Sequence, residues 1–128
     1  MTPVEIAIWA SAYIEIHQDQ KRWNASDPLW WSIERFMIGH SNGASPEDCW
    51  PAILEILRRR PSESVLNVLA AGPLEDLIAN CGDNFIERIE AEARKDPEFR
   101  DLLGGVWKNA ASDEVWARVD RARGGARW

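Results

Sequence analysis

The stretch NVLAAGPLEDLIANCG, residues 67–82, decides how the fold is interpreted. Its apolar residues follow helical spacing, yet Gly72 and Pro73 stand in the middle of it. Proline suits the first position of a helix because its missing N–H has no partner there, and glycine is common where helices end. We therefore predict that one short helix ends at Gly72, that another begins at Pro73, and that the chain turns sharply between them.

Prolines mark further helix starts on both sides of this stretch. Three segments place a capping residue directly before a proline: TPVE (2–5), DPLWW (27–31) and DPEF (96–99). The first of them also carries a glutamate in the position that completes a capping box. In SPEDCWP, residues 45–51, we prefer Asp48 as the cap, because a cap at Ser45 would leave Pro51 inside the helix.

Helical spacing of apolar residues continues along the chain, and no alternating run typical of a strand occurs. The predicted helices cover about 3–19, 28–39, 49–59, 63–71, 73–80, 84–95, 97–103 and 113–122. Residues 40–45 and 104–112 are predicted loops. We expect an all-α fold, a compact bundle of about seven or eight short helices, with helix pairs of the HEAT type as an alternative. The bundle is predicted to be one domain, residues 1–128, with a frayed basic tail at 123–128.

Composition excludes several classes of partner. The chain has 128 residues and a formal net charge of −6, which opposes nucleic-acid phosphates and anionic lipid. We expect no nucleic acid and no membrane as partner, and instead a protein with a basic surface. The first twenty residues lack the pattern of a signal peptide, and no apolar run is long enough to span a bilayer. A soluble cytoplasmic protein is predicted.

Most of the negative charge lies in one region. Residues 75–101 hold nine acidic residues and four basic ones. The candidate partner-binding residues are Glu75, Asp76, Glu87 and Glu90, with Trp31 as an aromatic anchor. The alternative interpretation is an ordinary solvated helix face, in which Glu75 and Asp76 complement the dipole at a helix N-terminus.

Metal and nucleophile chemistry find no support in the residue spacing. The soft ligands are His17, His40, Cys49 and Cys81, and no two of them have the spacing of a metal motif. Neither cysteine lies in a nucleophile motif, and no serine elbow or phosphate-binding glycine motif occurs. We therefore predict no catalytic residue, no metal and no cofactor.

Two further functions stay open. The first is a small-ligand binder or enzyme whose pocket lies where GPLED meets LLGGVW, with Gly104 and Gly105 allowing close approach and Trp107 stacking on the ligand. The second is a self-associating subunit, because eight tryptophans are more than a chain of this length needs. The tryptophans expected in the core are Trp9, Trp50, Trp107 and Trp116, and one of Trp23, Trp31 and Trp128 is expected to be exposed.

The segment 69–107 resembles an uncharacterised family of small bacterial all-helical proteins, a domain of unknown function. The motifs that carry the resemblance are AAGPLEDLI (70–78), FIERIEAEA (85–93) and DPEFRDLLGGVW (96–107), with a weaker likeness in DPLWWSIE and DCWPAILEIL. The resemblance implies a bacterial origin and a standalone helical domain, and it brings no activity. Our leading hypothesis is a non-enzymatic protein-binding module, an inhibitor of the immunity or antitoxin type.

Overall fold

The computed structural model describes residues 1–126 and 128, and these residues form helices, turns and loops without a strand. The predicted all-α class is thus confirmed. The chain forms two compact units, Met1–Val68 (the N-terminal unit) and Leu69–Trp128 (the C-terminal unit). This division does not test the predicted single domain or the HEAT-type pairing, and both stay predictions.

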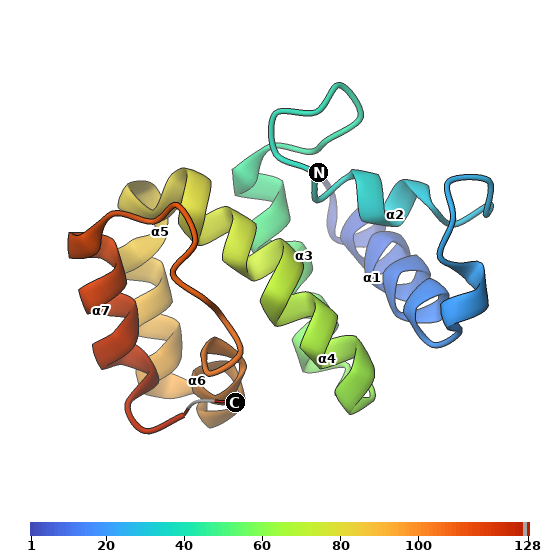
Figure 1. The fold of residues 1–128 in the computed structure, drawn as a ribbon. Coiled ribbons are helices and arrows are strands. Elements are labelled where there is room, and N and C mark those ends of the chain that lie inside the picture. Colours follow the sequence, from blue (N-terminus) through green and yellow to red (C-terminus); the bar gives the residue numbers. More distant parts are fainter. Residues whose placement is uncertain (127) are drawn as a thin grey trace. The chain divides into compact units, whose positions relative to one another are not determined.

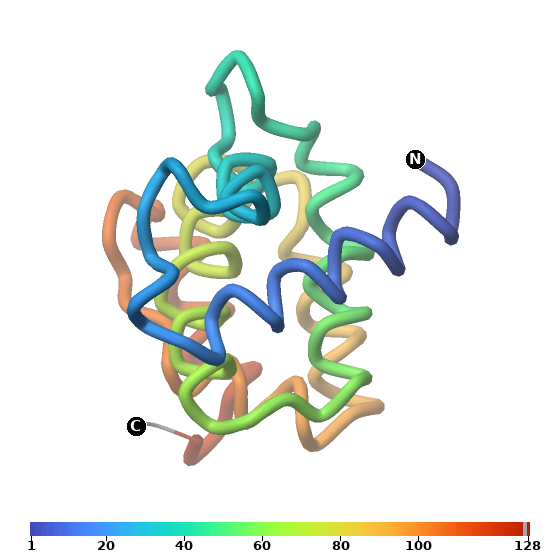
Figure 2. Tube along the Cα trace, turned by 90° about the vertical axis from the view of Figure 1, so that its right-hand side faces the viewer, coloured from blue at the N-terminus to red at the C-terminus, as the bar shows by residue number. Residues whose placement is uncertain are grey.

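The N-terminal unit is built around its first helix. Its elements are α1 (Pro3–His17), the 3-10 turn η1 (Gln20–Arg22), α2 (Trp31–Glu34), α3 (Pro46–Arg58) and the start of α4 (Glu63–Leu69). Helix α1 packs against α3, α2 and η1 (Figures 1 and 2). Thr2 and Glu5 form the predicted capping box at its start. The largest fully buried side chain is Trp9, whose indole Nε1 donates to the Ser32 carbonyl at 2.9 Å.

Helix α2 is far shorter than predicted. Asp27 caps the segment by accepting a hydrogen bond from the Leu29 amide at 2.9 Å, but the amides of Trp30, Ser32 and Ile33 bond carbonyls only three residues back. Such bonds form turns rather than an α-helix. At the other end Gly39 adopts a positive φ of 83°, which ends helical geometry. The predicted helix 28–39 is therefore wrong outside Trp31–Glu34.

The cap of α3 is also corrected. Ser45, not Asp48, is the N-cap, and its hydroxyl accepts from the Asp48 amide at 3.3 Å. Pro46 occupies the first helical position and Pro51 lies inside the helix. Pro51 lacks the N–H that would bond the Glu47 carbonyl, and the chain tolerates it because Glu47 lies in the exposed first turn.

The C-terminal unit is organised by one long helix. Its elements are the π-helical turn η2 (Ala70–Leu74), α5 (Glu75–Lys95), α6 (Pro97–Leu103) and α7 (Asp113–Arg123). Helix α5 packs against η2, α6 and α7 (Figure 1). Its buried face includes Leu77, Ile78, Phe85 and Ile89. Asp96 caps α6 as predicted, accepting from the Glu98 amide at 2.9 Å.

Gly72 and Pro73 do not form the predicted corner. They lie in η2, where the Glu75 amide bonds the Ala70 carbonyl five residues back. A π-helical turn uses such wider bonds, so it accommodates a proline that cannot donate to the usual carbonyl. The residues from Glu63 to Lys95 consequently form one helical run, whose backbone leaves helical geometry at Cys81. With this run counted once, the described residues contain six α-helical segments instead of seven or eight.

A second backbone irregularity lies nine residues after Gly72, at Cys81. Its φ of −135° and ψ of 22° are non-helical and kink α5. Gly82 follows, and a Cβ there would lie 2.7 Å from Val115 Cγ1 on α7. The bend and the missing side chain together allow α7 to pack closely on α5. The predicted gap between helices ending at 80 and starting at 84 marks this place.

Candidate functional site

Glu75 is engaged within the C-terminal unit. Its Oε1 accepts from the Trp107 amide at 2.9 Å and its Oε2 from Asn109 Nδ2 at 3.2 Å. The carboxylate thus holds the loop between α6 and α7. The neighbouring Asp76 is half-buried, and burial followed by the nearby Glu75 charge raises the pKa of its carboxyl. A role of either residue in partner binding stays a prediction.

Glu87 and Glu90 lie beyond the kink in α5. Glu87 is exposed, whereas Glu90 accepts two hydrogen bonds from the Arg118 guanidinium on α7. That hydrogen bonding is the main reason why the pKa of the Glu90 carboxyl is lowered. Twelve residues of helix separate Glu75 from Glu87, up to about 18 Å at 1.5 Å per residue. The four predicted acidic residues therefore form two pairs rather than one cluster.

The space above the predicted glycine pocket is occupied by the chain itself. A Cβ at Gly105 would clash with the Trp128 ring, and one at Gly104 would lie 2.9 Å from the Ala126 backbone. The Trp128 amide also donates to the Gly104 carbonyl at 3.0 Å. Both glycines therefore allow close approach of the tail. Fraying of 123–128 stays a prediction, and Arg127 lies outside the described residues.

Trp107 is 75% exposed, which corrects its assignment to the core. It lies in the loop 104–112, where adjacency to apolar residues carries no helical periodicity and does not predict burial. Trp9 and Trp50 are buried and Trp116 is half-buried. Among the three candidates for exposure, Trp23 and Trp128 are exposed, and Trp31 is half-buried.

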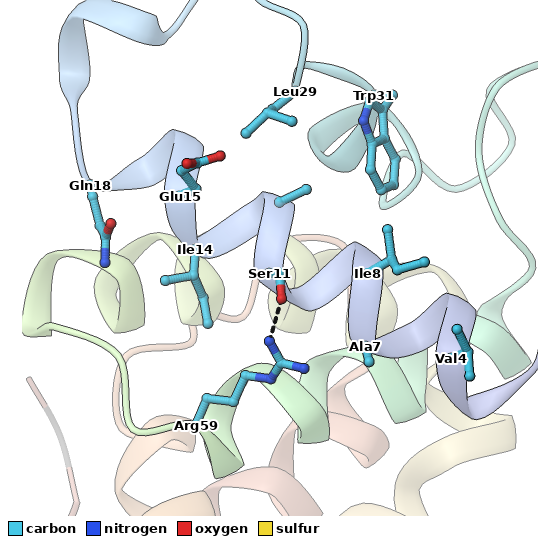
Figure 3. A pocket seen from close by; sticks show the side chains of 11 residues that line it. Val4, Ala7, Ile8, Ser11, Ile14, Glu15, Gln18, Leu29, Trp31 and Arg59 are labelled. Atoms are coloured by element: carbon cyan, nitrogen blue, oxygen red, sulfur yellow. Dashed lines mark hydrogen bonds between the residues drawn. The ribbon is translucent and has the colours of Figure 1, made fainter.

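Trp31 lines an open groove on the N-terminal unit, which we call the α1 groove (Figure 3). Its volume is about 780 Å³. The floor is one side of α1, with Val4 68% and Ile8 56% exposed. Leu29 and Trp31 form one wall, and the Trp31 ring points toward Ile8 in Figure 3. The groove is thus an apolar surface with an aromatic side chain beside it.

The opposite wall of the α1 groove is Arg59, which follows α3. Its guanidinium donates to Ser11 Oγ on α1 (Figure 3). It also donates to Glu55 Oε2. On the first wall, the Arg35 guanidinium lies 4.5 Å from the centre of the Trp31 ring. Cation–π stacking of this kind restrains the aromatic side chain. Both walls are therefore held by polar contacts that leave the floor uncovered.

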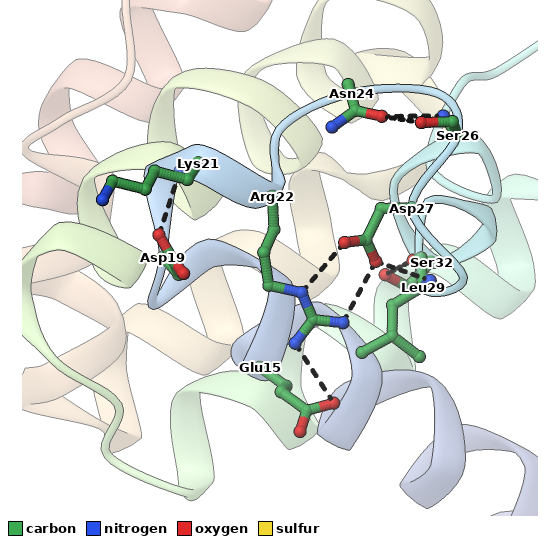
Figure 4. Close-up of polar contacts among 9 residues, drawn as sticks. All are labelled: Glu15, Asp19, Lys21, Arg22, Asn24, Ser26, Asp27, Leu29 and Ser32. Carbon is green, nitrogen blue, oxygen red and sulfur yellow. Dashed lines mark hydrogen bonds and ion pairs between the residues drawn. The ribbon is translucent and has the colours of Figure 1, made fainter.

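A network of ion pairs positions the segment that carries Leu29 (Figure 4). Arg22 donates to both carboxylate oxygens of Asp27, at 2.9 and 3.1 Å, and lies 3.9 Å from Glu15. The Arg22 hydrogen bond is the main cause that lowers the pKa of the Asp27 carboxyl. Asp27 in turn accepts from the Leu29 amide, so the network connects α1 to the wall of the groove.

His17 at the end of α1 contacts the same segment. Its Nδ1 accepts from Trp23 Nε1 at 2.7 Å, and its ring lies 4.2 Å from that of Tyr13. Burial lowers the pKa of His17 to about 4. With Nδ1 as the acceptor, the neutral imidazole carries its hydrogen on Nε2. That atom is buried and meets no hydrogen-bond partner among the described residues.

Sequence reasoning missed the α1 groove, although a signal was present. Helix α1 is apolar on nearly every side, which is typical of a helix that is covered on all faces. In the structure it is covered on one side only. The excess of apolar residues in PVEIAIWASAYIEIH could therefore have pointed to a surface that needs a partner.

Two classes of site are absent from the part of the chain that the structure describes. No three histidine, cysteine, aspartate or glutamate side chains come together in a way that could bind a metal ion. Within residues 1–126 and 128, no helix combines the length and the apolar character required to cross a bilayer.

In the comparison with protein families, residues 18–127 match the Family of unknown function (DUF6869). The chain belongs to this family. The resemblance to an uncharacterised family is confirmed at this level, while the motifs that carried it and the bacterial origin stay predictions. Comparisons with curated proteins and with solved structures give no significant match.

The residues matched to DUF6869 include the walls of the α1 groove but not its floor. Helix α1, which supplies the floor, precedes the residues matched to DUF6869. The walls, Leu29 with Trp31 and Arg59, lie within them. The Glu75–Trp107 and Glu90–Arg118 contacts of the C-terminal unit also lie within them.

Proposed function

We propose that this chain is a non-enzymatic protein-binding module whose α1 groove receives an amphipathic helix of a basic partner protein. The observation that carries the proposal is the uncovered apolar side of α1. Val4 and Ile8 expose more than half of their surface beside Trp31 and Leu29. Exposed apolar patches with a polar rim are typical of protein-interaction surfaces, and helix-in-groove binding is a recurring way to cover them.

The dimensions of the groove favour a helix over a compact metabolite. Its lining follows α1 from Val4 to Gln18 at the spacing of one helix face. Fourteen residues of α-helix extend about 21 Å. An elongated open surface of this length matches about four turns of a partner helix, whereas small-molecule sites enclose most of their ligand. Trp31 then serves as the aromatic anchor that the sequence suggested.

Charge supports a basic partner. Glu15 lines the groove and is exposed, and the exposed Asp19 follows the end of α1. The net charge of −6 and exposed acidic residues such as Glu87 would speed association with a cation-rich protein. The finer form of the proposal is a bacterial cytoplasmic inhibitor of the immunity or antitoxin type, which neutralises such a partner by binding it.

The test compares Ile8→Asp with Met37→Asp. Met37 is also an exposed apolar residue of the N-terminal unit, but it does not line the groove. Each tagged variant is used to capture proteins from lysate at low and high salt, and the captured protein is then purified and titrated against each variant by calorimetry. Circular dichroism checks that both variants fold.

We expect the wild type and Met37→Asp to bind one basic protein, and Ile8→Asp to lose at least tenfold in affinity because a carboxylate enters the apolar floor. Equal binding by Ile8→Asp would refute the groove as the binding surface. The groove could instead bind a second copy of the chain, and light scattering tests this case. If the wild type is a dimer and Ile8→Asp is a monomer, the groove is assigned to self-association and the proposed partner is overturned.

A further inference from the structure

We propose that the C-terminal unit contains a second, separate site, which binds a phosphate group. The site is a hollow of about 380 Å³ lined by Glu90, Ala93, Arg94, Arg100, Arg121 and Ala122. We call it the arginine hollow. Nothing in the proposed helix-binding function requires it, because none of its lining residues belongs to the α1 groove.

Three helices each contribute one arginine to the lining of the hollow. Arg94 comes from the last turn of α5, Arg100 from α6 and Arg121 from the last turn of α7. Arg94 and Arg100 belong to the most acidic region of the sequence, and the fold adds Arg121 from a distant segment. Gathering like charges is unfavourable unless an anion compensates them, so this convergence points to a ligand.

The three arginines differ in how much they are already engaged. Arg100 donates from Nε and Nη2 to the Ala93 carbonyl, at 3.2 and 3.0 Å, which fixes its planar group. Arg94 and Arg121 are exposed, and neither forms a side-chain hydrogen bond or an ion pair with another described residue. One restrained donor group and two adaptable ones can therefore approach the same ligand.

Glu90 is the one carboxylate in the lining of the hollow, and its single negative charge cannot offset all three arginines. Its two oxygens are bonded by a fourth arginine, Arg118. That hydrogen bonding, together with the charges of Arg94 and Arg121, lowers the pKa of Glu90. The guanidinium groups of Arg118, Arg94 and Arg121 thus all act on this one carboxylate. The lining itself carries three arginines and one glutamate, so a net positive charge is available to a ligand.

Basic residues in last turns also complement the helix dipole, which accounts for an arginine near the end of α5 or α7. Dipole complementarity does not require the side chains of two helices to line one hollow with a third arginine from α6. A phosphate group would satisfy all three, because guanidinium groups bind its oxygens in bidentate fashion. Inorganic phosphate and a phosphate monoester share this chemistry.

The test is an NMR titration of the full-length, isotope-labelled chain with sodium phosphate and, separately, with O-phosphoserine. Sodium chloride at matched ionic strength is the reference, and the Nε–Hε signals of the arginines are followed. Arg121→Gln removes one donor group of the hollow. The matched control is Lys95→Gln, which removes the same charge from an exposed neighbouring side chain that pairs with Glu92 outside the hollow.

We expect saturable shifts in the wild type and in Lys95→Gln, and a dissociation constant raised about fivefold or more in Arg121→Gln. Tighter binding of O-phosphoserine than of phosphate would assign the site to a monoester, and equal binding to the free ion. Shifts no larger than those with chloride, or an unchanged constant in Arg121→Gln, would overturn the proposal. Ile8→Asp should bind phosphate normally, so the two proposals fail independently.

Discussion

Helices α1 and α5 each organise one unit of the chain, but they distribute their apolar residues differently. Helix α5 buries Leu77, Phe85 and Ile89 and turns charged residues to solvent. Helix α1 buries Trp9 and Ile16 but leaves Val4 and Ile8 exposed. An apolar face that the fold does not cover contributes nothing to the stability of the free protein. Helix α1 therefore carries more apolar residues than its packing within the unit buries.

The largest expected effect comes from comparing a substitution on the buried side of α1 with one on its exposed side. Trp9→Ala should lower the free energy of unfolding by about 3–5 kcal/mol, because it empties a fully buried site and leaves the Ser32 carbonyl without its donor. Ile8→Ala should change it by about 0.5 kcal/mol or less. Urea denaturation measures both values. Similar losses for the two variants would show that the groove floor supports the fold.

The pH dependence of the N-terminal unit offers the next largest effect. Burial lowers the pKa of His17 to about 4 from its ordinary 6.5. Between these two pH values the unfolded chain therefore binds a proton at His17, whereas the folded chain does not. The stability that the folded chain gains while His17 is neutral is therefore fully present above pH 6.5, and it is lost as the pH falls toward 4. It amounts to at most about 3 kcal/mol. Urea denaturation between pH 4.5 and 7.5 follows it.

His17→Phe is the control for that series, since phenylalanine keeps a ring beside Tyr13 but cannot titrate. Its stability should change less over the same pH range. Glu55 does not interfere: hydrogen bonds from Arg58 and then Arg59 lower its pKa to about 2, so its contribution is present above pH 4.5 and is lost only below that value. If the free energy of unfolding changed with pH by the same slope in the wild type and in His17→Phe, His17 would not be the cause of the pH dependence.

Two glycines of the helical run from Glu63 to Lys95 should respond in opposite directions. At Gly72 nothing lies within 4 Å of an added Cβ, so Gly72→Ala should stabilise the chain by about 0.5–1 kcal/mol. At Gly82 the added carbon would lie 2.7 Å from Val115 Cγ1, and overpacking costs about 1–3 kcal/mol. Thermal unfolding of both variants is the measurement, and stabilisation by Gly82→Ala would contradict the close packing of α7 on α5.

The smallest expected effect concerns the loop held by Glu75. Glu75→Ala removes the acceptor of the Trp107 amide and should lower the free energy of unfolding by about 1 kcal/mol. The amide proton of Trp107 should exchange faster with solvent, whereas that of Phe85 in the core should not change. Glu87→Ala, an exposed residue of the same helix, is the matched control. Unchanged exchange at Trp107 would mean that the loop is held by other contacts.

The sequence predicted the helical class, the caps at Thr2 and Asp96, and the gap near Cys81, because these depend on short-range backbone chemistry. The predicted break at Gly72 and the predicted cap of α3 at Asp48 were wrong for the same reason. A proline in a helix forbids one hydrogen bond, but a wider turn or an exposed first turn removes the penalty. Residue spacing alone does not show which of these solutions the chain adopts.

The candidate site was predictable only in part. Trp31 was singled out and lines the α1 groove, but Ile8 and Arg59 were not, since their meeting depends on how α1 packs against α3. The arginine hollow was equally hidden, because Arg94 and Arg121 are far apart in the sequence. The sequence also did not predict Trp107 as the partner of Glu75 or Arg118 as the partner of Glu90, because both come from distant segments.

The kink in α5 also has a practical consequence for labelling chemistry. Cys49 is buried, whereas Cys81, at the kink, is half-buried and has a thiol pKa raised by burial. Because alkylation proceeds through the thiolate, a maleimide fluorophore or nitroxide should attach slowly at neutral pH, and at Cys81 before Cys49. A single reporter can thus be installed at the bend of α5 without mutating either cysteine.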